Sequence, residues 1–352
     1  MRPVLEGFRT LLVLGRVSNL PTVWSNLIVG WILADGPRVD VVRRAGYNGP
    51  NDTIWPLLFV LIGGSFLYVG GMYLNDFCDA AFDARYCPAR PIPSGKISRR
   101  LVGLLATLWF TVGYRCFVPF GPVTIGFALV LIAVIVLYDF HHKNVAWAPL
   151  VMSFCRCLLY LLAFSSFRES DWFGNDYGDW LDDALNYLSI LGYLRNDSWA
   201  MALDVINFFP TAIPLGLYVA GIAYLARGES RPGKTTRWPL LLLLLAVIVL
   251  AHIYGIFIGR FDWLLVRHPH EFLLFLVRLL VPCLFLPGWM VWLLIPFWRG
   301  TRPSVGRVVS GLLAGIVLLD MIVISLQVGP HAFILFPLFL LALLLQRMIP
   351  AT

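Results

Sequence analysis

The sequence predicts an all-α protein, a polytopic membrane helical bundle of about nine to ten transmembrane helices. Of its 352 residues, 59% are hydrophobic and only 13% are charged, and the mean hydropathy is +0.79. A soluble domain carries nearer a quarter charged residues. The apolar runs are continuous and about as long as a helix needs to cross a bilayer, and they do not alternate as barrel strands do. Helices are therefore the expected way to satisfy the backbone in lipid.

The apolar segments follow one another along the chain and form one predicted integral-membrane domain, residues 1–352. The first segment is short unless its helix begins near Leu11. The candidate spans, in order, are residues 20–34, 54–75, 101–117, 123–138, 148–166, 208–226, 238–258, 272–297, 308–327 and 332–348.

One long polar stretch, residues 168–207, separates the fifth and sixth candidate spans. It is rich in Asp and Glu, and Arg168 and Arg195 are its only basic residues. We predict an extracytoplasmic acidic loop insertion here, since Lys and Arg gather in the loops on the opposite side and basic loops are typically cytoplasmic. The same rule predicts that segment 73–95 faces the cytoplasm. We expect an integral membrane protein of the cell inner membrane. The net charge of +7 then comes from cytoplasmic loops, so we expect no nucleic-acid partner.

The most informative stretch is residues 73–95, which continues directly from an apolar span. Asn75, Asp76, Asp79 and Asp83 fall within an arc of about 100° on one helical face. Three carboxylates on one face repel one another unless a cation neutralises them. Oxygen ligands favour hard cations, and Mg²⁺ typically joins carboxylates to substrate phosphates. These four residues are therefore a candidate Mg²⁺ site, and the plainer alternative is an acidic helix end that lies in water.

Basic residues follow this face within a few positions, at Arg85, Arg90 and Lys96. Arg and Lys bind phosphate groups, and Arg does so with two parallel hydrogen bonds. The stretch thus places anion-binding groups beside a metal-binding face.

The order Asn-Asp-x-x-Asp-x-x-x-Asp at 75–83, followed by Arg-Pro-Ile-Pro-Ser-Gly at 90–95, resembles the first aspartate-rich motif of the UbiA family of intramembrane prenyltransferases. The resemblance implies a UbiA-prenyltransferase-like bundle. It also implies that the residues of the acidic face hold Mg²⁺ and the substrate diphosphate. Arg90 would lie in the loop that closes over that diphosphate.

A second resemblance lies at the predicted cytoplasmic end of the fourth span, in Tyr138-Asp-Phe-His-His-Lys-Asn144. It is similar to the family's Tyr-x-x-x-Lys element, whose tyrosine and lysine approach the diphosphate, although here the spacing is one residue longer. Tyr138 and Lys143 are therefore candidate catalytic residues. The alternative is that they anchor the helix at the membrane interface.

An arginine lies inside the fifth span, at Arg156. Burying it in lipid costs roughly 2.5–3.5 kcal/mol on insertion scales, so such residues usually face the bundle interior. Ser153 and Tyr160 share its helical face. We expect Arg156 to point inward, towards the diphosphate or a carboxylate. The alternative is that its side chain extends to the cytoplasmic interface.

Other polar residues within the spans have open roles. Asp320 is an isolated intramembrane carboxylate that could pair with Arg278 or His252, or line an acceptor cavity. Three residues of the first span could line an acceptor pocket or pack between helices: Asn19, Trp24 and Asn26.

The chain departs from the family pattern after the sixth span, where a second Asp-x-x-x-Asp motif is expected. Residues 218–230 contain no aspartate, and Tyr224, Arg227 and Glu229 are the polar candidates there. Arg227 would then face the diphosphate as a direct cation, in place of one bridged by metal.

Three functions are consistent with this sequence. The leading one is a Mg²⁺-dependent prenyltransferase that moves an isoprenoid group from an allylic prenyl diphosphate to an unidentified lipophilic acceptor within membrane lipid. The second is an intramembrane terpene cyclase, in which the same ionisation is followed by capture by the substrate's own double bonds. The third is a non-catalytic prenyl-lipid binder or carrier, which the missing second motif favours.

Overall fold

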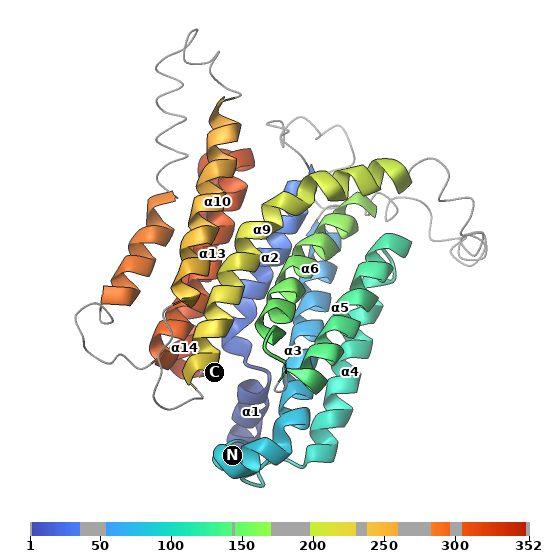
Figure 1. The fold of residues 1–352 in the computed structure, drawn as a ribbon. Helices are drawn as coiled ribbons and strands as arrows, with labels where there is room; N and C mark the ends of the chain where they lie inside the picture. Colours follow the sequence, from blue (N-terminus) through green and yellow to red (C-terminus); the bar gives the residue numbers. More distant parts are fainter. Residues whose placement is uncertain are drawn as a thin grey trace, which may run out of the picture.

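The computed structural model describes residues 2–35, 54–142, 145–169, 198–229, 238–259, 283–295 and 305–349. Within these ranges every regular element is a helix, which confirms the predicted all-α class (Figure 1). Among the described residues, five helices are long and apolar enough to cross a membrane: Val17–Ala34, Trp55–Tyr86, Pro122–His141, Ala148–Glu169 and Gly306–Ser325. The predicted total of nine to ten spans stays a prediction, because several segments lie outside the described residues.

The helices follow the predicted order. A separate helix precedes the first span, the helix of the second span continues past residue 75 to Tyr86, and the sixth helix begins at Ser198 instead of 208. Residues 170–197 of the predicted acidic loop lie outside the described residues. The elements are α1 (Arg2–Leu14), η1 (Val17–Asn19), α2 (Leu20–Asp35), α3 (Ile54–Tyr86), α4 (Arg99–Phe117), α5 (Pro122–His141), α6 (Ala148–Glu169), α9 (Ser198–Glu229), α10 (Pro239–Gly259), a helix over Cys283–Ile295, α13 (Val305–Val328), η3 (Gly329–Leu335) and α14 (Phe336–Met348).

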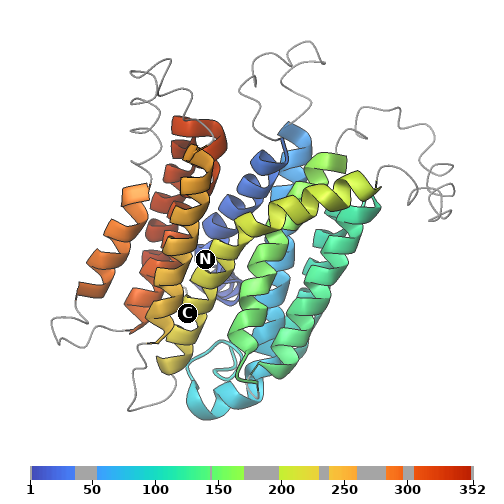
Figure 2. The ribbon, with the colours of Figure 1, turned by 45° about the horizontal axis from the view of Figure 1, so that its top comes forward.

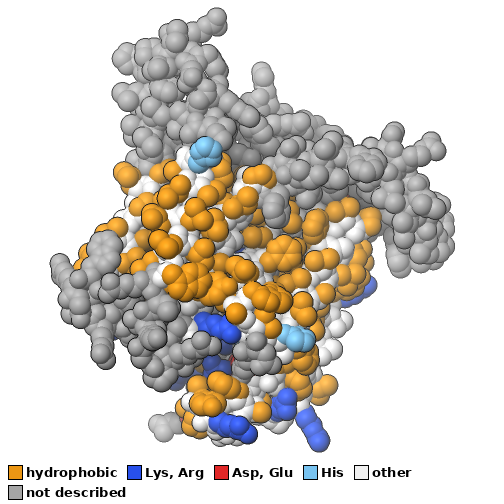
Figure 3. All heavy atoms as spheres, viewed as in Figure 1, with side chains coloured by type: hydrophobic (Ala, Val, Ile, Leu, Met, Phe, Trp, Pro, Cys, Tyr) orange, Lys and Arg blue, Asp and Glu red, His pale blue; other side chains and the backbone are white. Residues whose placement is uncertain are grey.

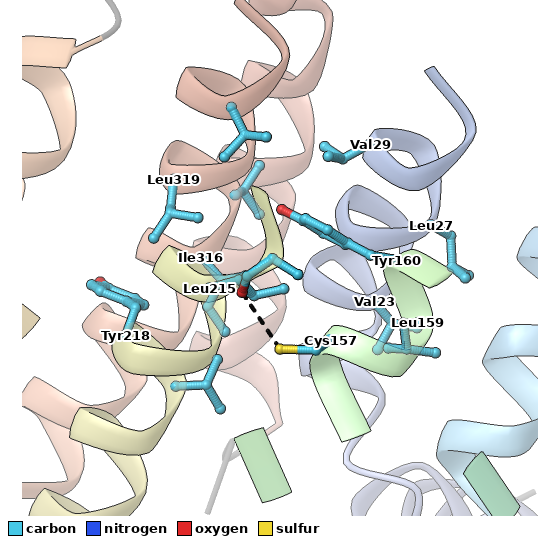
Figure 4. Packing of buried hydrophobic residues seen from close by; sticks show 14 of the residues in the cluster. Val23, Leu27, Val29, Cys157, Leu159, Tyr160, Leu215, Tyr218, Ile316 and Leu319 are labelled. Atoms are coloured by element: carbon cyan, nitrogen blue, oxygen red, sulfur yellow. Dashed lines mark hydrogen bonds between the residues drawn. The ribbon is translucent and has the colours of Figure 1, made fainter. Parts of the chain in front are cut away.

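The core lies where α2, α6, α9 and α13 meet (Figures 1 and 2). Leu27 of α2, Leu162 of α6 and Leu215 of α9 are fully buried there. Figure 4 shows Tyr160 reaching from α6 towards α13, and Cys157 donating a hydrogen bond to the carbonyl oxygen of Ala212 on α9. The helices α3, α4 and α5 lie beside this core on one side, with α3 packed closely against α4.

Glycine allows two of these close approaches. A Cβ at Gly30 of α2 would lie 2.3 Å from the carbonyl oxygen of Tyr160 on α6, and one at Gly113 of α4 would lie 3.0 Å from the carbonyl oxygen of Gly63 on α3. Small residues serve this purpose in membrane bundles, where close packing replaces the hydrophobic effect between helices.

The outer surface has an apolar band. On the face in Figure 3, hydrophobic side chains cover the middle of the molecule, and Lys and Arg side chains gather near the lower end, where α3 finishes. Large apolar side chains such as Leu104, Leu241 and Leu284 are exposed. Exposed apolar surface of this extent is what a lipid environment requires.

At the opposite end of the bundle, a carboxylate from α6 caps α5. Glu169 is buried, and its side chain accepts hydrogen bonds from the backbone N–H groups of Val123 (3.1 Å) and Thr124 (2.8 Å). These are free donors at the start of a helix, and a negative charge there also complements the helix dipole. A Cβ at Gly121 would lie 2.6 Å from this carboxyl group, so glycine keeps the space open.

We therefore expect Glu169→Ala to lower the free energy of unfolding by about 1–2 kcal/mol, the usual cost of losing a charged cap. The measurement is the thermal unfolding midpoint in detergent. Arg115→Gln, an exposed change on α4, is the control and should leave the midpoint unchanged. An unaltered midpoint for Glu169→Ala would show that the cap contributes nothing.

Candidate functional site

The acidic face of α3 lies inside the bundle. Asn75, Asp76 and Asp79 are each 8% exposed, and Asp83 is 3% exposed. The alternative of an acidic helix end in water is therefore wrong. The helix continues to Tyr86, and the four residues predicted as metal ligands share its enclosed face.

Two arginines neutralise this face. Arg90 Nη1 lies 2.8 Å from Asp83 Oδ2 and 3.8 Å from Asp76 Oδ1. Arg16 Nη2 lies 3.7 Å from Asp76 Oδ1 and donates a hydrogen bond to Asn75 Oδ1 over 3.4 Å. Arg90 was expected in this position, whereas Arg16 was not among the predicted site residues.

Local backbone geometry places both arginines. Arg16 has a left-handed conformation (φ 42°) at the break between α1 and η1, which turns the chain back towards α3. Arg90 belongs to a series of tight turns after α3, in which Cys87 N–H bonds to Asp83 O and Ser94 N–H bonds to Arg90 O. Gly95, at φ +75°, allows this segment to reverse.

The end of α5 forms a second wall of the site. Asn75 Nδ2 donates to Asp139 Oδ1 (3.0 Å), and His142 Nε2 lies 3.6 Å from Asp79 Oδ2. The other ring nitrogen of His142 lies 3.2 Å from the carbonyl oxygen of Asp139. Burial lowers the pKa of His142, but the interactions with Asp79 and Asp139 together raise it by more, so its pKa is above its ordinary value.

Sequence reasoning missed Asp139 and His142, although both belong to the stretch 138–144 that it singled out. A carboxylate one residue after Tyr138, within an apolar helix, was the signal that could have found Asp139. Tyr138 itself stacks on His142, with ring centroids 5.0 Å apart, and its hydroxyl donates to Met152 Sδ over 3.8 Å.

The remaining predicted phosphate-binding residues are placed differently. The side chains of Arg85 and Lys96 are exposed near the end of α3, and Lys143 lies outside the described residues. Arg227 donates to the carbonyl oxygens of Val145 (2.7 Å) and Ala146 (3.3 Å), so it ties α9 to the connection between α5 and α6.

The intramembrane arginine faces the bundle interior. Arg156 Nη1 donates to Asn26 Oδ1 (3.1 Å), and Asn26 Nδ2 donates to Asp320 Oδ2 (2.8 Å). Tyr160 donates to the other oxygen of Asp320. The expected pairing of Asp320 with His252 is wrong, because the His252 side chain is exposed on α10. The other expected partner, Arg278, lies outside the described residues.

The polar residues of η1 and α2 suggested for an acceptor pocket also lie inward. Asn19 and Asn26 are buried, and Trp24 Nε1 donates to Ser65 Oγ on α3 over 2.8 Å. Trp24 thus joins two helices, whereas Asn26 belongs to the polar group around Arg156.

The α3 face has a donor set that suits Mg²⁺, since its side chains offer only amide and carboxylate oxygens. Asp76 Oδ1 and Asp139 Oδ2 are buried and accept no hydrogen bond from the described residues. Within the same ranges, however, no three His, Cys, Asp or Glu side chains are already gathered as a metal cage. The residues therefore fit a cation shared with a substrate oxygen better than one held by protein alone.

The fold and this site define a helical membrane protein with a neutralised acidic face at one end of the bundle. The model of the UbiA prenyltransferase family matches residues 44–301, which is most of the chain. The chain therefore belongs to the UbiA prenyltransferase family, and it is an integral membrane protein.

Individual relatives match parts of the chain. Digeranylgeranylglyceryl phosphate synthase of Sulfolobus acidocaldarius is 35% identical over 92 residues, which cover 25% of this chain and 33% of that protein. The enzyme of the same name from Methanoregula boonei is 28% identical over 138 residues, 39% of this chain and 44% of its own. 4-Hydroxybenzoate octaprenyltransferase of Serratia proteamaculans is 27% identical over 126 residues, 35% of this chain and 42% of its own. The chain thus spans less than half the length of each.

A solved structure, from a study of digeranylgeranylglyceryl phosphate synthase in membranes, resembles this one over nearly its whole length. It covers 92% of this chain and 99% of its own, with a TM-score of 0.50 and 15% sequence identity. At that identity the likeness shows the fold alone.

Removing Arg90 should destabilise the site, because Asp83 and Asp76 would then repel each other while buried. We expect Arg90→Gln to lower the free energy of unfolding by about 1.5–3 kcal/mol, the range for hydrogen bonds to charged groups. Thermal unfolding in Mg²⁺-free buffer measures this, with the exposed Arg100→Gln as the matched control. Equal midpoints for the two variants would contradict the proposed neutralisation.

Proposed function

We propose that this protein is a Mg²⁺-dependent intramembrane prenyltransferase, which moves an isoprenoid group from an allylic prenyl diphosphate to a lipophilic acceptor. The observation that carries the proposal is the buried acidic face of α3 with Arg16 and Arg90 against it. Membership of the UbiA prenyltransferase family supports the reaction class. The lysines and arginines near the end of α3 favour an active site that faces the cytoplasm of a cell inner membrane.

The two arginines are suited to binding the diphosphate. In the structure they neutralise Asp76 and Asp83, and both guanidinium groups can instead bind phosphate oxygens. A bound Mg²⁺ would supply the positive charge that lets Asn75, Asp76, Asp79 and Asp83 accept a polyanionic substrate and that stabilises the diphosphate as it leaves. The carboxylates of α3 hold the cationic groups in place before the substrate arrives.

The chemical step balances as a substitution at carbon. The bond between C1 of the isoprenoid and the diphosphate oxygen breaks, and its electron pair leaves with the diphosphate. A nucleophilic atom of the acceptor bonds to C1 and loses a proton. The products are prenylated acceptor, diphosphate and the proton, and Arg16 and Arg90 are the side chains placed to stabilise the leaving charge.

Because the second aspartate motif is missing, two other functions are considered, and the experiment below also tests them. Arg227 lies against the loop carbonyls of Val145 and Ala146, and residues 218–230 contain no aspartate. A terpene cyclase would ionise the same substrate without needing an acceptor. A prenyl-lipid binder would bind it without ionisation.

We expect Asp76→Asn/Asp79→Asn to lower diphosphate release at least about 100-fold, the usual effect of losing a group that stabilises transition-state charge. The assay supplies farnesyl or geranylgeranyl diphosphate with Mg²⁺, with and without a lipid extract. Removal of Mg²⁺ by EDTA should have a similar effect. Arg100→Gln, on the exposed side of α4, should retain wild-type release.

The acceptor dependence decides between the functions. Release that requires the extract supports a transferase. Release without the extract, accompanied by a hydrocarbon or alcohol product, indicates a cyclase. Binding of the diphosphate without any release would show a binder and would overturn the proposal.

A further inference from the structure

The end of α5 brings a fourth aspartate to the acidic face of α3. Asp139 is 4% exposed, and its Oδ1 accepts a hydrogen bond from Asn75 Nδ2 over 3.0 Å. Its other oxygen, Oδ2, is buried and accepts no hydrogen bond from the described residues. Asp139 belongs neither to the aspartate-rich stretch at 75–83 nor to the second motif expected after the sixth span. Its carboxyl group therefore needs an explanation of its own.

Two pairs of side chains face each other between α3 and α5. On α3, Asn75 and Asp79 share a face because they are four residues apart. At the end of α5, Asp139 and His142 are three residues apart and share a face in the same way. Asn75 bonds to Asp139, and His142 Nε2 lies 3.6 Å from Asp79 Oδ2. One carboxylate from each helix therefore borders the same small region.

The charge of Asp139 is not matched by a neighbouring cation. The two arginines of the site form their ion pairs with Asp76 and Asp83. Among the described residues, no cationic side chain lies within ion-pairing distance of the Asp139 carboxyl group. A buried carboxylate whose side-chain partner is a neutral amide is costly unless a cation joins it or a proton neutralises it. These two alternatives can be separated by experiment.

The oxygens gathered here favour the cation. Asn75, Asp79 and Asp139 offer one amide and two carboxylates, and Mg²⁺ typically takes one or two carboxylates together with water and substrate phosphate. Asp139 also supplies a carboxylate from a second helix. The family pattern places that contribution after the sixth span, where residues 218–230 contain no aspartate.

We propose that Asp139 is a further ligand of the Mg²⁺ ion, so that the cation is held between α3 and α5. The carboxylate of α5 then takes the part of the missing second aspartate motif. Because no three carboxylate or imidazole groups of the described residues are already gathered as a cage, a diphosphate oxygen completes the site. The inference rests on the proposed function for the presence of Mg²⁺, and it adds which second helix holds the ion.

The first test measures the Mn²⁺ affinity of the full chain in detergent, from the electron paramagnetic resonance signal of free Mn²⁺. Mn²⁺ is a suitable probe because it takes the same oxygen ligands as Mg²⁺. Each titration is run without and with farnesyl thiolodiphosphate, a slowly ionising donor analogue, and protein-free samples correct for Mn²⁺ that the analogue binds. The proteins are wild type, Asp139→Asn, Asp76→Asn/Asp79→Asn and the exposed control Glu6→Gln.

We expect Asp139→Asn to weaken Mn²⁺ binding at least about tenfold, the lower end of the loss seen when a supporting group of a metal site is removed. Asparagine keeps an oxygen to which Asn75 can donate, so the charge is lost while the hydrogen bond between α3 and α5 can persist. Glu6→Gln should bind Mn²⁺ as wild type does. Equal affinities for wild type and Asp139→Asn would show that Asp139 is neutral in the protein, and the proposal would fail.

The second test asks whether Asp139 touches the ion, because a residue that only positions Asn75 could also weaken binding. Asp139→Cys replaces the carboxylate with a thiolate, which favours soft cations. Cd²⁺ bound by this thiolate should give a charge-transfer band in the ultraviolet. Asp139→Ser, which is of similar size, gives the background from the native cysteines. Identical Cd²⁺ spectra for the two variants would make Asp139 a positioning residue and reject it as a ligand.

The outcomes separate this inference from the proposed function. Mn²⁺ binding that is lost in Asp76→Asn/Asp79→Asn but unchanged in Asp139→Asn would keep the metal face of α3 and reject Asp139. No Mn²⁺ binding by wild type in either titration would reject the cation site as a whole. Absence of diphosphate release, with Asp139 still required for Mn²⁺ binding, would count against the transferase alone. If Asp139→Asn does not fold, the Cd²⁺ spectra decide.

Discussion

The burial of three aspartates on one face of α3 is the constraint that shapes this end of the molecule. Buried like charges are tolerated only when opposite charges and hydrogen bonds surround them. The chain meets that requirement from three directions: Arg90 from the turns after α3, Arg16 from the break before α2, and the Asp139–His142 end of α5. One of these segments has a left-handed backbone, at Arg16, where α1 breaks before η1.

The membrane imposes the complementary constraint deeper in the bundle. There, polar side chains have no water with which to hydrogen-bond. Several of the described ones form hydrogen bonds with side chains on neighbouring helices. Arg156, Asn26, Asp320 and Tyr160 make one such series, and Trp24 with Ser65 makes another. The close contact at Gly30 brings α2 and α6 together one turn from Asn26, which bonds to Arg156 on α6. Close helix packing and hydrogen bonding between polar side chains therefore occur together inside the bundle.

The sequence predicted what depends on local periodicity. Continuous apolar runs indicate the helical class. Spacing along one segment gives the shared face of Asn75, Asp76, Asp79 and Asp83 and the proximity of Arg90. Residues brought in from elsewhere could not be found this way, because nothing near Arg16 or His142 in the sequence indicates that α3 will lie against them. The orientation of Arg227 also depends on tertiary structure, because its side chain donates a hydrogen bond to a loop carbonyl oxygen. The candidate membrane span ends at residue 75, and the helix that carries it runs on to Tyr86 with its carboxylates buried, which spacing along the sequence does not reveal.

The two polar groups differ in how the chain encodes them. The α3 face and Arg90 occupy one short stretch, residues 75–90, although Arg16 and His142 reach that face from elsewhere in the chain. The group around Arg156 is dispersed over positions 26, 156, 160 and 320, on three helices that are far apart in the sequence. Changes at any of these positions can therefore alter the deeper polar group while the contacts within residues 75–90 stay intact. Such a scaffold can vary its two polar groups separately, by scattered point substitutions and without exchanging a domain.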